Sequence, residues 1–147
     1  MKYVIDTSVS VKWFVPEQGH ETALRLLDDS VERYAPDILF IEAANALRKK
    51  LRNEEISREQ VEGSISVLFG FFNAVIPTVS LVQSALTLAV ELDHPVQDCC
   101  FLAAALSQDI LLVTADTRFI SKSGPYRSHL LDLAEISAVD LNPSRNH

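Results

Sequence analysis

Short apolar runs alternate along this chain with longer segments in which apolar residues recur at helical spacing. The runs at 2–6, 74–78 and 109–116 are continuous, and the last gives the clearest strand pattern. Helical spacing is predicted over 18–30, from Pro36 to about Asn53, over 80–92 and over 95–107. Strands that alternate with helices in this way are typical of an α/β domain.

Shorter signals complete the pattern. Ser57 and Gln60 have capping-box spacing, which predicts a further helix running towards Phe72. A short helix is expected at 116–123, and 129–136 is expected to hold a last strand or turn. Because the apolar strands are short and continuous, we expect a mostly parallel sheet with helices on both faces, in a single domain over 1–147.

Composition places the chain among globular proteins of a reducing compartment. It has 147 residues, 48% of them hydrophobic, and no apolar run of the ~18 residues that a membrane span needs. Asp6 interrupts the N-terminal apolar stretch and no small-residue cleavage site follows it, so no signal peptide is expected. Cys99 and Cys100 are sequence neighbours in an apolar run, which favours buried free thiols over a disulfide or a metal site. We therefore expect a cytoplasmic protein without a membrane partner.

Charge argues at first against a phosphate-covering protein. The formal net charge is 13 − 20 = −7, whereas nucleic-acid binding depends on an excess of Lys and Arg. If four of the acids held metal ions, the remaining balance would be 13 − 16 = −3. The location of the acids therefore matters more than their number.

Four acids stand apart because their neighbours are apolar. Asp6 and Asp116 each end a predicted strand, and such strand ends gather at one edge of a parallel sheet. An unpaired charge among apolar residues costs several kcal/mol, so these groups are expected to be protonated, paired or bound to a cation. We call the set the acid quartet, and its members are Asp6, Glu42, Asp98 and Asp116.

The helical members of the quartet have suitable settings. Glu42 and Asn45 are three residues apart and share a helix face, while Asp98 lies in the first turn of its predicted helix, where the helix dipole favours a negative charge. Carboxylate oxygens without thiolate or histidine partners suit Mg²⁺ or Mn²⁺. Divalent ions held in this way support phosphodiester hydrolysis and reverse the sign of an acidic site that faces RNA.

Four segments resemble the acidic motifs of the PIN-domain family in its VapC-type toxin form: VIDTSVSVKWFVPE, FIEAANAL, QDCCFLAAAL and LLVTADTRF. The resemblance runs from residue 2 to about 120 and implies a three-layer α/β/α fold and a metal-dependent endoribonuclease. It implies that the acid quartet is catalytic and binds Mg²⁺ or Mn²⁺, with Asp6 and Asp98 as the principal ligands. Ser8, Asn45 and Thr114 match the polar residues that support those acids. The implied partners are an RNA substrate, a cognate antitoxin and a second copy in a homodimer.

The departures from the family pattern are small. Gln97 stands before Asp98 where an aromatic residue is common, and Cys99 and Cys100 replace small or apolar residues. None of these changes removes a ligand, so the sequence does not indicate an inactive enzyme.

Each acid also has a structural interpretation. Asp6 could cap a turn, Glu42 could be a surface residue, and Asp98 could be only a helix N-terminal charge. Asp116 could cap the helix that follows it, a role compatible with metal binding.

Other features leave alternatives open. A basic run near the end of the second predicted helix is either a solvated helix end or a phosphate-contacting patch; it comprises Arg48, Lys49, Lys50 and Arg52. Two aromatic groups belong either to the core or to a partner surface; they are Trp13 with Phe14, and Phe69 with Phe71 and Phe72. The four histidines share no metal-binding spacing, and none is assigned a role.

Two other functions compete with the endoribonuclease. A catalytically silent PIN-like module would bind RNA or a partner without cleaving it. A phosphotransfer domain also places an aspartate after its first strand, but such sites need a neighbouring second acid where this chain has Thr7 and Ser8.

Overall fold

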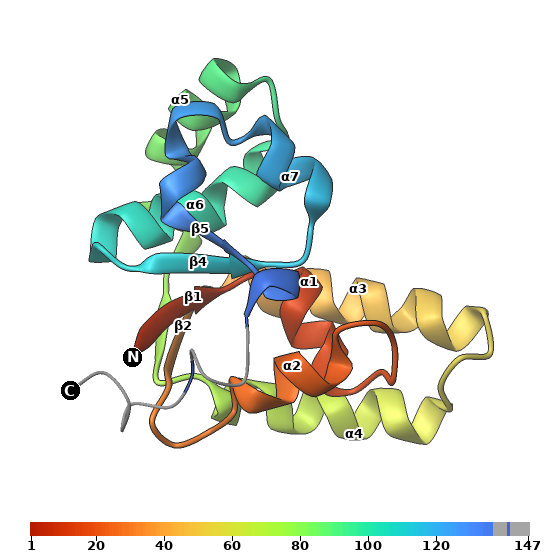
Figure 1. Ribbon diagram of the computed structural model, residues 1–147. Coiled ribbons are helices and arrows are strands. Elements are labelled where there is room, and N and C mark those ends of the chain that lie inside the picture. The colour runs from red at the N-terminus through yellow and green to blue at the C-terminus, as the bar shows by residue number, and fades with distance from the viewer. Residues whose placement is uncertain (137–140, 142–147) are drawn as a thin grey trace.

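A parallel five-stranded sheet forms the centre of the molecule, in a computed structural model that describes residues 1–136 and 141 (Figure 1). The strand order is β3-β2-β1-β4-β5, and each neighbouring pair is parallel. The strands are β1 (Lys2–Ile5), β2 (Glu32–Pro36), β3 (Ala74–Ile76), β4 (Leu111–Thr114) and β5 (Leu130–Asp132). The predicted mostly parallel sheet is confirmed.

Helices cover both faces of this sheet (Figure 1). On one side lie α1 (Thr7–Ser10), α2 (His20–Arg25), α3 (Ile38–Arg52) and α4 (Arg58–Leu68). On the other side lie α5 (Val82–Leu92), α6 (Val96–Gln108) and α7 (Thr117–Lys122). Five short 3-10 helices join them: η1 (Val11–Trp13), η2 (Phe69–Phe71), η3 (Thr78–Ser80), η4 (Gly124–His129) and η5 (Leu133–Glu135). The α/β/α layering expected from the sequence is confirmed.

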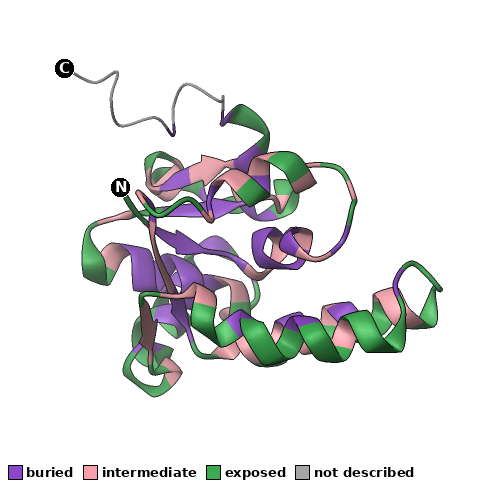
Figure 2. Ribbon diagram, turned by 90° about the horizontal axis from the view of Figure 1, so that it is seen from below, coloured by how far each residue is buried: buried purple, intermediate pink, exposed green. Residues whose placement is uncertain are grey.

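The core fills both faces of the sheet, and on one face it lies beneath α6, which packs on β1, β2 and β4. Seven consecutive residues of α6, Cys99–Ala105, are buried, so this helix is apolar nearly all round, as a core helix must be (Figure 2). Burial raises the pKa of the Cys99 thiol to about 11, with a smaller contribution from the charge of Asp98. Both cysteines are buried and unpaired, as expected. No helix within the described residues is long and apolar enough to cross a membrane.

Some elements differ from the sequence prediction. β2 and α1 were not predicted, because Glu32 and Arg33 interrupt the apolar pattern of β2 and α1 is only four residues long. The helix expected over 18–30 is confined to α2, which begins after Gly19, a residue whose φ of 87° few other residues adopt. The strand expected over 109–116 begins at Leu111, because Asp109 ends α6 in a left-handed conformation.

A long hairpin of α3 and α4 extends from the body of the molecule (Figure 1). The predicted capping box at its turn is confirmed: the Gln60 N–H donates to Ser57 Oγ over 3.1 Å, and the Ser57 N–H donates to Gln60 Oε1 over 2.8 Å. Aromatic rings join the hairpin to η1, and Trp13 packs against Phe71 and Phe72 with ring centroids 5.7 Å apart. The two aromatic groups of the sequence therefore form one cluster, in which Phe69 remains exposed.

Candidate metal centre

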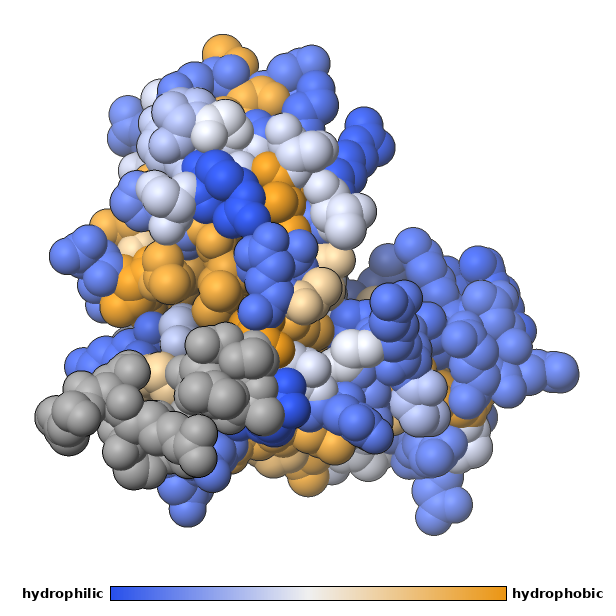
Figure 3. Space-filling view, viewed as in Figure 1, coloured by the Kyte–Doolittle hydropathy of each residue, from blue (hydrophilic) through white to orange (hydrophobic). Residues whose placement is uncertain are grey.

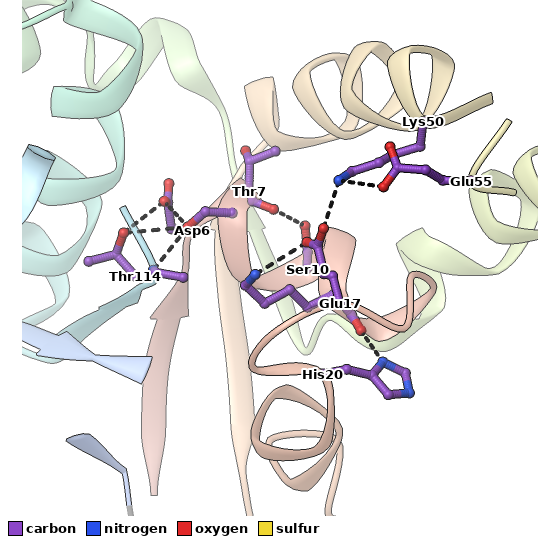
Figure 4. Close-up of polar contacts among 11 residues, drawn as sticks. Asp6, Thr7, Ser10, Glu17, His20, Lys50, Glu55 and Thr114 are labelled. Carbon is purple, nitrogen blue, oxygen red and sulfur yellow. Dashed lines mark hydrogen bonds and ion pairs between the residues drawn. The ribbon is translucent and has the colours of Figure 1, made fainter. Parts of the chain in front are cut away.

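Asp6 is the buried member of the acid quartet. It follows β1, which pairs directly with β4, and its side chain does not cap α1. Instead its Oδ2 accepts hydrogen bonds from Ser8 Oγ at 2.6 Å and from Thr114 Oγ1 at 2.9 Å (Figure 4). The carboxylate is thus held by one hydroxyl from α1 and one from the carboxyl end of β4.

Asp116 follows β4 at the same edge of the sheet. Its Oδ1 accepts the N–H groups of Arg118 at 3.0 Å and Phe119 at 3.1 Å, so it caps α7, as one interpretation of the sequence expected. Its own N–H donates to Thr114 Oγ1 at 3.1 Å. The fully buried Thr114 therefore connects Asp6 with Asp116.

Glu42 comes to the site from α3. Its Oε1 accepts a hydrogen bond from Thr7 Oγ1 at 3.0 Å, across 35 residues of sequence. The side chain is only partly exposed, which does not match a freely solvated surface glutamate. Asn45 is exposed, and its side chain makes no hydrogen bond with the described residues. Its supporting role beside Glu42 therefore stays a prediction.

Asp98 lies in the first turn of α6 and is held by a histidine. His94 Nε2 lies 2.7 Å from Asp98 Oδ2, four residues away, and with a proton on Nε2 the imidazole donates to the carboxylate. The imidazole ring is stacked on Phe119 with centroids 4.7 Å apart, and its side chain is only 2% exposed. The ring is therefore fixed by packing as well as by its hydrogen bond.

The four acids act on one another electrostatically. Burial raises the pKa of Asp6 from 3.8 to about 6, against the lowering effect of Ser8 and Thr114, and the charges of Asp98 and Asp116 raise it further. Burial also raises the pKa of Glu42, which the charges of Asp6 and Asp98 raise further although Thr7 lowers it.

Asp98 follows the same rule. Burial raises its pKa, the contact with His94 lowers it, and the charge of Asp116 raises it. These mutual effects connect all four carboxylates, although β1, α3, α6 and β4 contribute them from distant parts of the sequence. A local excess of negative charge is the electrostatic setting that a bound cation relieves.

Each acid has one oxygen held by the protein and one without a protein donor. The held oxygens are Asp6 Oδ2, Glu42 Oε1, Asp98 Oδ2 and Asp116 Oδ1. Within residues 1–136 and 141, the only buried side-chain nitrogen or oxygen without a partner is Arg25 Nε, so the four free oxygens reach accessible space.

This donor set fits a hard divalent cation. Free carboxylate oxygens with fixed orientations are the ligands that Mg²⁺ and Mn²⁺ prefer, and hydrogen bonds to the second oxygen are typical of metal-ligating carboxylates. No three acidic, histidine or cysteine side chains of the described residues converge into a ready-made ligand cage. The chemistry of the donors therefore fits a metal, and ligation would require side-chain movements that bring the carboxylates together.

Two contacts of the site were not foreseen from the sequence. Thr7 was not assigned a role, and no local pattern relates it to a glutamate 35 residues away. The four histidines share no metal-binding spacing, but His94 lies four residues before Asp98 at a helix start, and that spacing is a signal for the contact.

Comparison with known proteins shows a relative of similar length. The chain is 28% identical over 124 residues to Ribonuclease VapC3 of Pyrobaculum aerophilum, covering 83% of this chain and 95% of that protein.

Three solved structures share the fold. PAE2754 of Pyrobaculum aerophilum has a TM-score of 0.69 at 18% identity, covering 91% of this chain and 85% of that one. A toxin-antitoxin complex from Klebsiella pneumoniae has a TM-score of 0.65 at 18% identity, covering 91% and 99%. VapBC2 of Rickettsia felis, bound to a DNA fragment from its promoter, has a TM-score of 0.62 at 17% identity, covering 90% and 97%. The PIN domain family matches residues 3–124, and this chain therefore belongs to the PIN domain family.

Proposed function

We propose that this protein is a Mg²⁺- or Mn²⁺-dependent endoribonuclease that acts as the toxin of a toxin–antitoxin pair. Its family and its similarity to Ribonuclease VapC3 support the class of reaction. The observation that carries the metal dependence is the shared arrangement of the acid quartet, in which each carboxylate has one oxygen held by the protein and one free.

Asp6, Asp98 and Asp116 would hold the cation, and Glu42 would complete the site. When bound, the ion would supply a more acidic water and offset charge on the phosphate. Glu42 or Asp116 would orient the attacking water or accept its proton.

Other side chains would set the positions of these acids. Ser8 and Thr114 orient Asp6 through its Oδ2, Thr7 orients Glu42, and the stacked His94 orients Asp98. These contacts limit the rotation of each carboxylate and leave its other oxygen available to an ion.

The proposed partners are an antitoxin and a second copy of the chain, in the cytoplasm. The Klebsiella pneumoniae and Rickettsia felis structures are assemblies of a toxin with its antitoxin, and they support the same association here. An exposed apolar row along η3 and α5 supports a homodimer; it consists of Val79, Val82, Leu86 and Val90.

The test is RNA cleavage by the purified protein with added Mg²⁺ or Mn²⁺. Cleavage should fall at least a thousandfold in Asp6→Asn and Asp98→Asn, since each change removes a charged ligand. Asp93→Asn is the matched control, because Asp93 is exposed and its left-handed conformation tolerates Asn.

Full cleavage by a folded Asp6→Asn protein, or in excess chelator, would overturn the mechanism. RNA binding that persists in both variants, without cleavage by the unaltered protein in either metal, would instead identify the silent RNA-binding module.

A further inference from the structure

We propose that Lys49 and Arg52, on the same side of α3 as Glu42, bind the phosphates of single-stranded RNA that flank the cleaved bond. We call these two residues the α3 row. The inference rests on the proposed function, because it assumes that RNA is cleaved at the acid quartet and that the flanking strand lies along α3.

The structure separates the four cations near the end of α3. Lys50 is engaged within the protein: its Nζ lies 2.7 Å from Glu17 Oε2 and 3.4 Å from Glu55 Oε1 (Figure 4). Glu17 also pairs with Lys12 at 3.2 Å, so the loop after η1 is tied to α3. Lys50 is therefore not available to a ligand unless these ion pairs break.

The other three cations are available. Arg48, Lys49 and Arg52 are exposed, and none makes a hydrogen bond or ion pair through its side chain with the part of the chain that the structure describes. Strongly hydrophilic side chains cover the hairpin end in the space-filling view (Figure 3). An unpaired cation on such a surface is free to neutralise a phosphate, which releases the counterions condensed on the nucleic acid.

Helix geometry distinguishes among these three. Lys49 follows Glu42 by seven residues and lies about 20° round the helix from it at 100° per residue, and Arg52 follows by ten residues and lies about 80° round. Arg48 follows by six residues, which places it about 120° round the helix from Glu42 at 100° per residue. The α3 row thus lies nearer than Arg48 to the face that carries Glu42, and Lys49 lies nearest.

Asn45 lies between Glu42 and the α3 row on the same face, three residues after Glu42. It is exposed and has no hydrogen-bond partner among the described residues. An amide can donate to a phosphate oxygen or accept from a ribose hydroxyl, so nothing between the acids and the row opposes a nucleic-acid backbone.

Distance determines what the α3 row does. With a rise of 1.5 Å per residue, Lys49 lies about 10 Å and Arg52 about 15 Å along the helix from Glu42. Both distances exceed the screening length of about 8 Å at physiological ionic strength. The row therefore acts on neighbouring phosphates and on RNA affinity, while the chemical step proceeds without it.

The test uses a fluorescent single-stranded RNA and the Asp6→Asn protein in Mg²⁺, so that binding is measured without cleavage. Lys49→Gln and Arg52→Gln should each weaken binding about fivefold at 0.1 M salt and lower the slope of log affinity against log salt by about 0.7. Arg48→Gln is the matched control and should change neither value. In the active protein, the two row variants should raise KM and leave kcat within twofold.

Unchanged affinity and salt slope in both row variants would overturn the inference, and so would an equal loss in Arg48→Gln. Binding that depends on the row, together with no cleavage by the unaltered protein, would contradict the proposed function and leave the α3 row standing. Normal cleavage with an unchanged KM in the row variants would contradict RNA binding by the α3 row and leave the proposed function intact.

Discussion

The acid quartet has a strand side and a helix side, and they are built differently. On the strand side, Asp6 and Asp116 share Thr114 and receive four hydrogen bonds in total, two of them from backbone N–H groups. On the helix side, Glu42 and Asp98 are each held by one side chain, Thr7 or His94. Each strand-side carboxylate is thus positioned by two hydrogen bonds, whereas each helix-side carboxylate is positioned by one.

This difference separates two kinds of sensitivity. Changes on the strand side should affect folding stability and activity together, because Asp6 and Thr114 are buried and the hydrogen bond between them joins the ends of β1 and β4. A change at Thr7 should affect metal affinity more than stability, because its contact with Glu42 is only partly buried, whereas His94 is buried against Phe119 and its loss should also affect stability.

The largest expected effect concerns the burial of Asp6. Its folded pKa of about 6 lies above the ordinary 3.8, so between these values the folded protein holds a proton that the unfolded chain releases. Stability should therefore fall as pH rises through this window, and at pH 7 the metal-free protein should be about 3 kcal/mol less stable than if the group stayed neutral.

Asp6→Asn, which cannot ionise, should be more stable than the unaltered protein in chelator at pH 7 and similar to it at pH 4. Denaturant unfolding at the two pH values measures the difference. An Asn variant that is no more stable at pH 7 would show that the ionised Asp6 carboxylate does not destabilise the folded protein.

Thr114→Val tests the shared contact of the strand side. The change keeps the shape but removes the donor to Asp6 and the acceptor for the Asp116 N–H. We expect a loss of about 2 kcal/mol in the free energy of unfolding and of 10- to 100-fold in cleavage. Thr117→Val, at an exposed position, is the control. Equal stability and equal cleavage in the two variants would show that Thr114 does not position Asp6.

His94→Leu tests the helix side. Without the donor to Asp98, Mn²⁺ affinity measured by calorimetry should fall 10- to 100-fold, and Thr7→Val should give about a tenfold loss through Glu42. His94→Gln, which retains an N–H donor, should recover part of the loss. If Leu and Gln behave alike, the histidine serves packing on Phe119 and not the position of Asp98.

The smallest expected effect separates the two roles of Asp116. Asp116→Ala should destabilise the protein by about 1 kcal/mol through loss of the α7 cap, whereas Asp116→Asn should retain most of that stability. Both variants should lose cleavage. Thermal unfolding, measured together with cleavage, separates the two roles. An active Asn variant would show that Asp116 serves only as the cap of α7.

The same division explains what the sequence could predict. Asp6 and Asp116 end apolar strands that pair with each other, so a one-dimensional pattern was enough to relate them, whereas Ser8 and Thr114 were indicated by the resemblance to the family. The capping box at Ser57 and the long helix α3 were likewise visible, because both depend on local spacing.

Contacts that depend on tertiary packing could not be predicted in this way. Thr7 meets Glu42 only because α1 packs on α3, and β2 becomes a strand because β1 and β3 flank it despite its polar residues. The aromatic groups at Trp13 and Phe71 are far apart in sequence, and only the folded hairpin unites them.

The two buried thiols of α6 have a practical consequence. Cys99 and Cys100 are inaccessible, and burial raises the pKa of both thiols, that of Cys99 to about 11. Both thiols are therefore protonated at neutral pH and are poor nucleophiles. A cysteine introduced at an exposed position such as Asn53, at the turn of the hairpin, would react selectively with maleimide dyes. The natural chain is thus already a suitable background for single-site fluorescent labelling, with no need to replace its own cysteines.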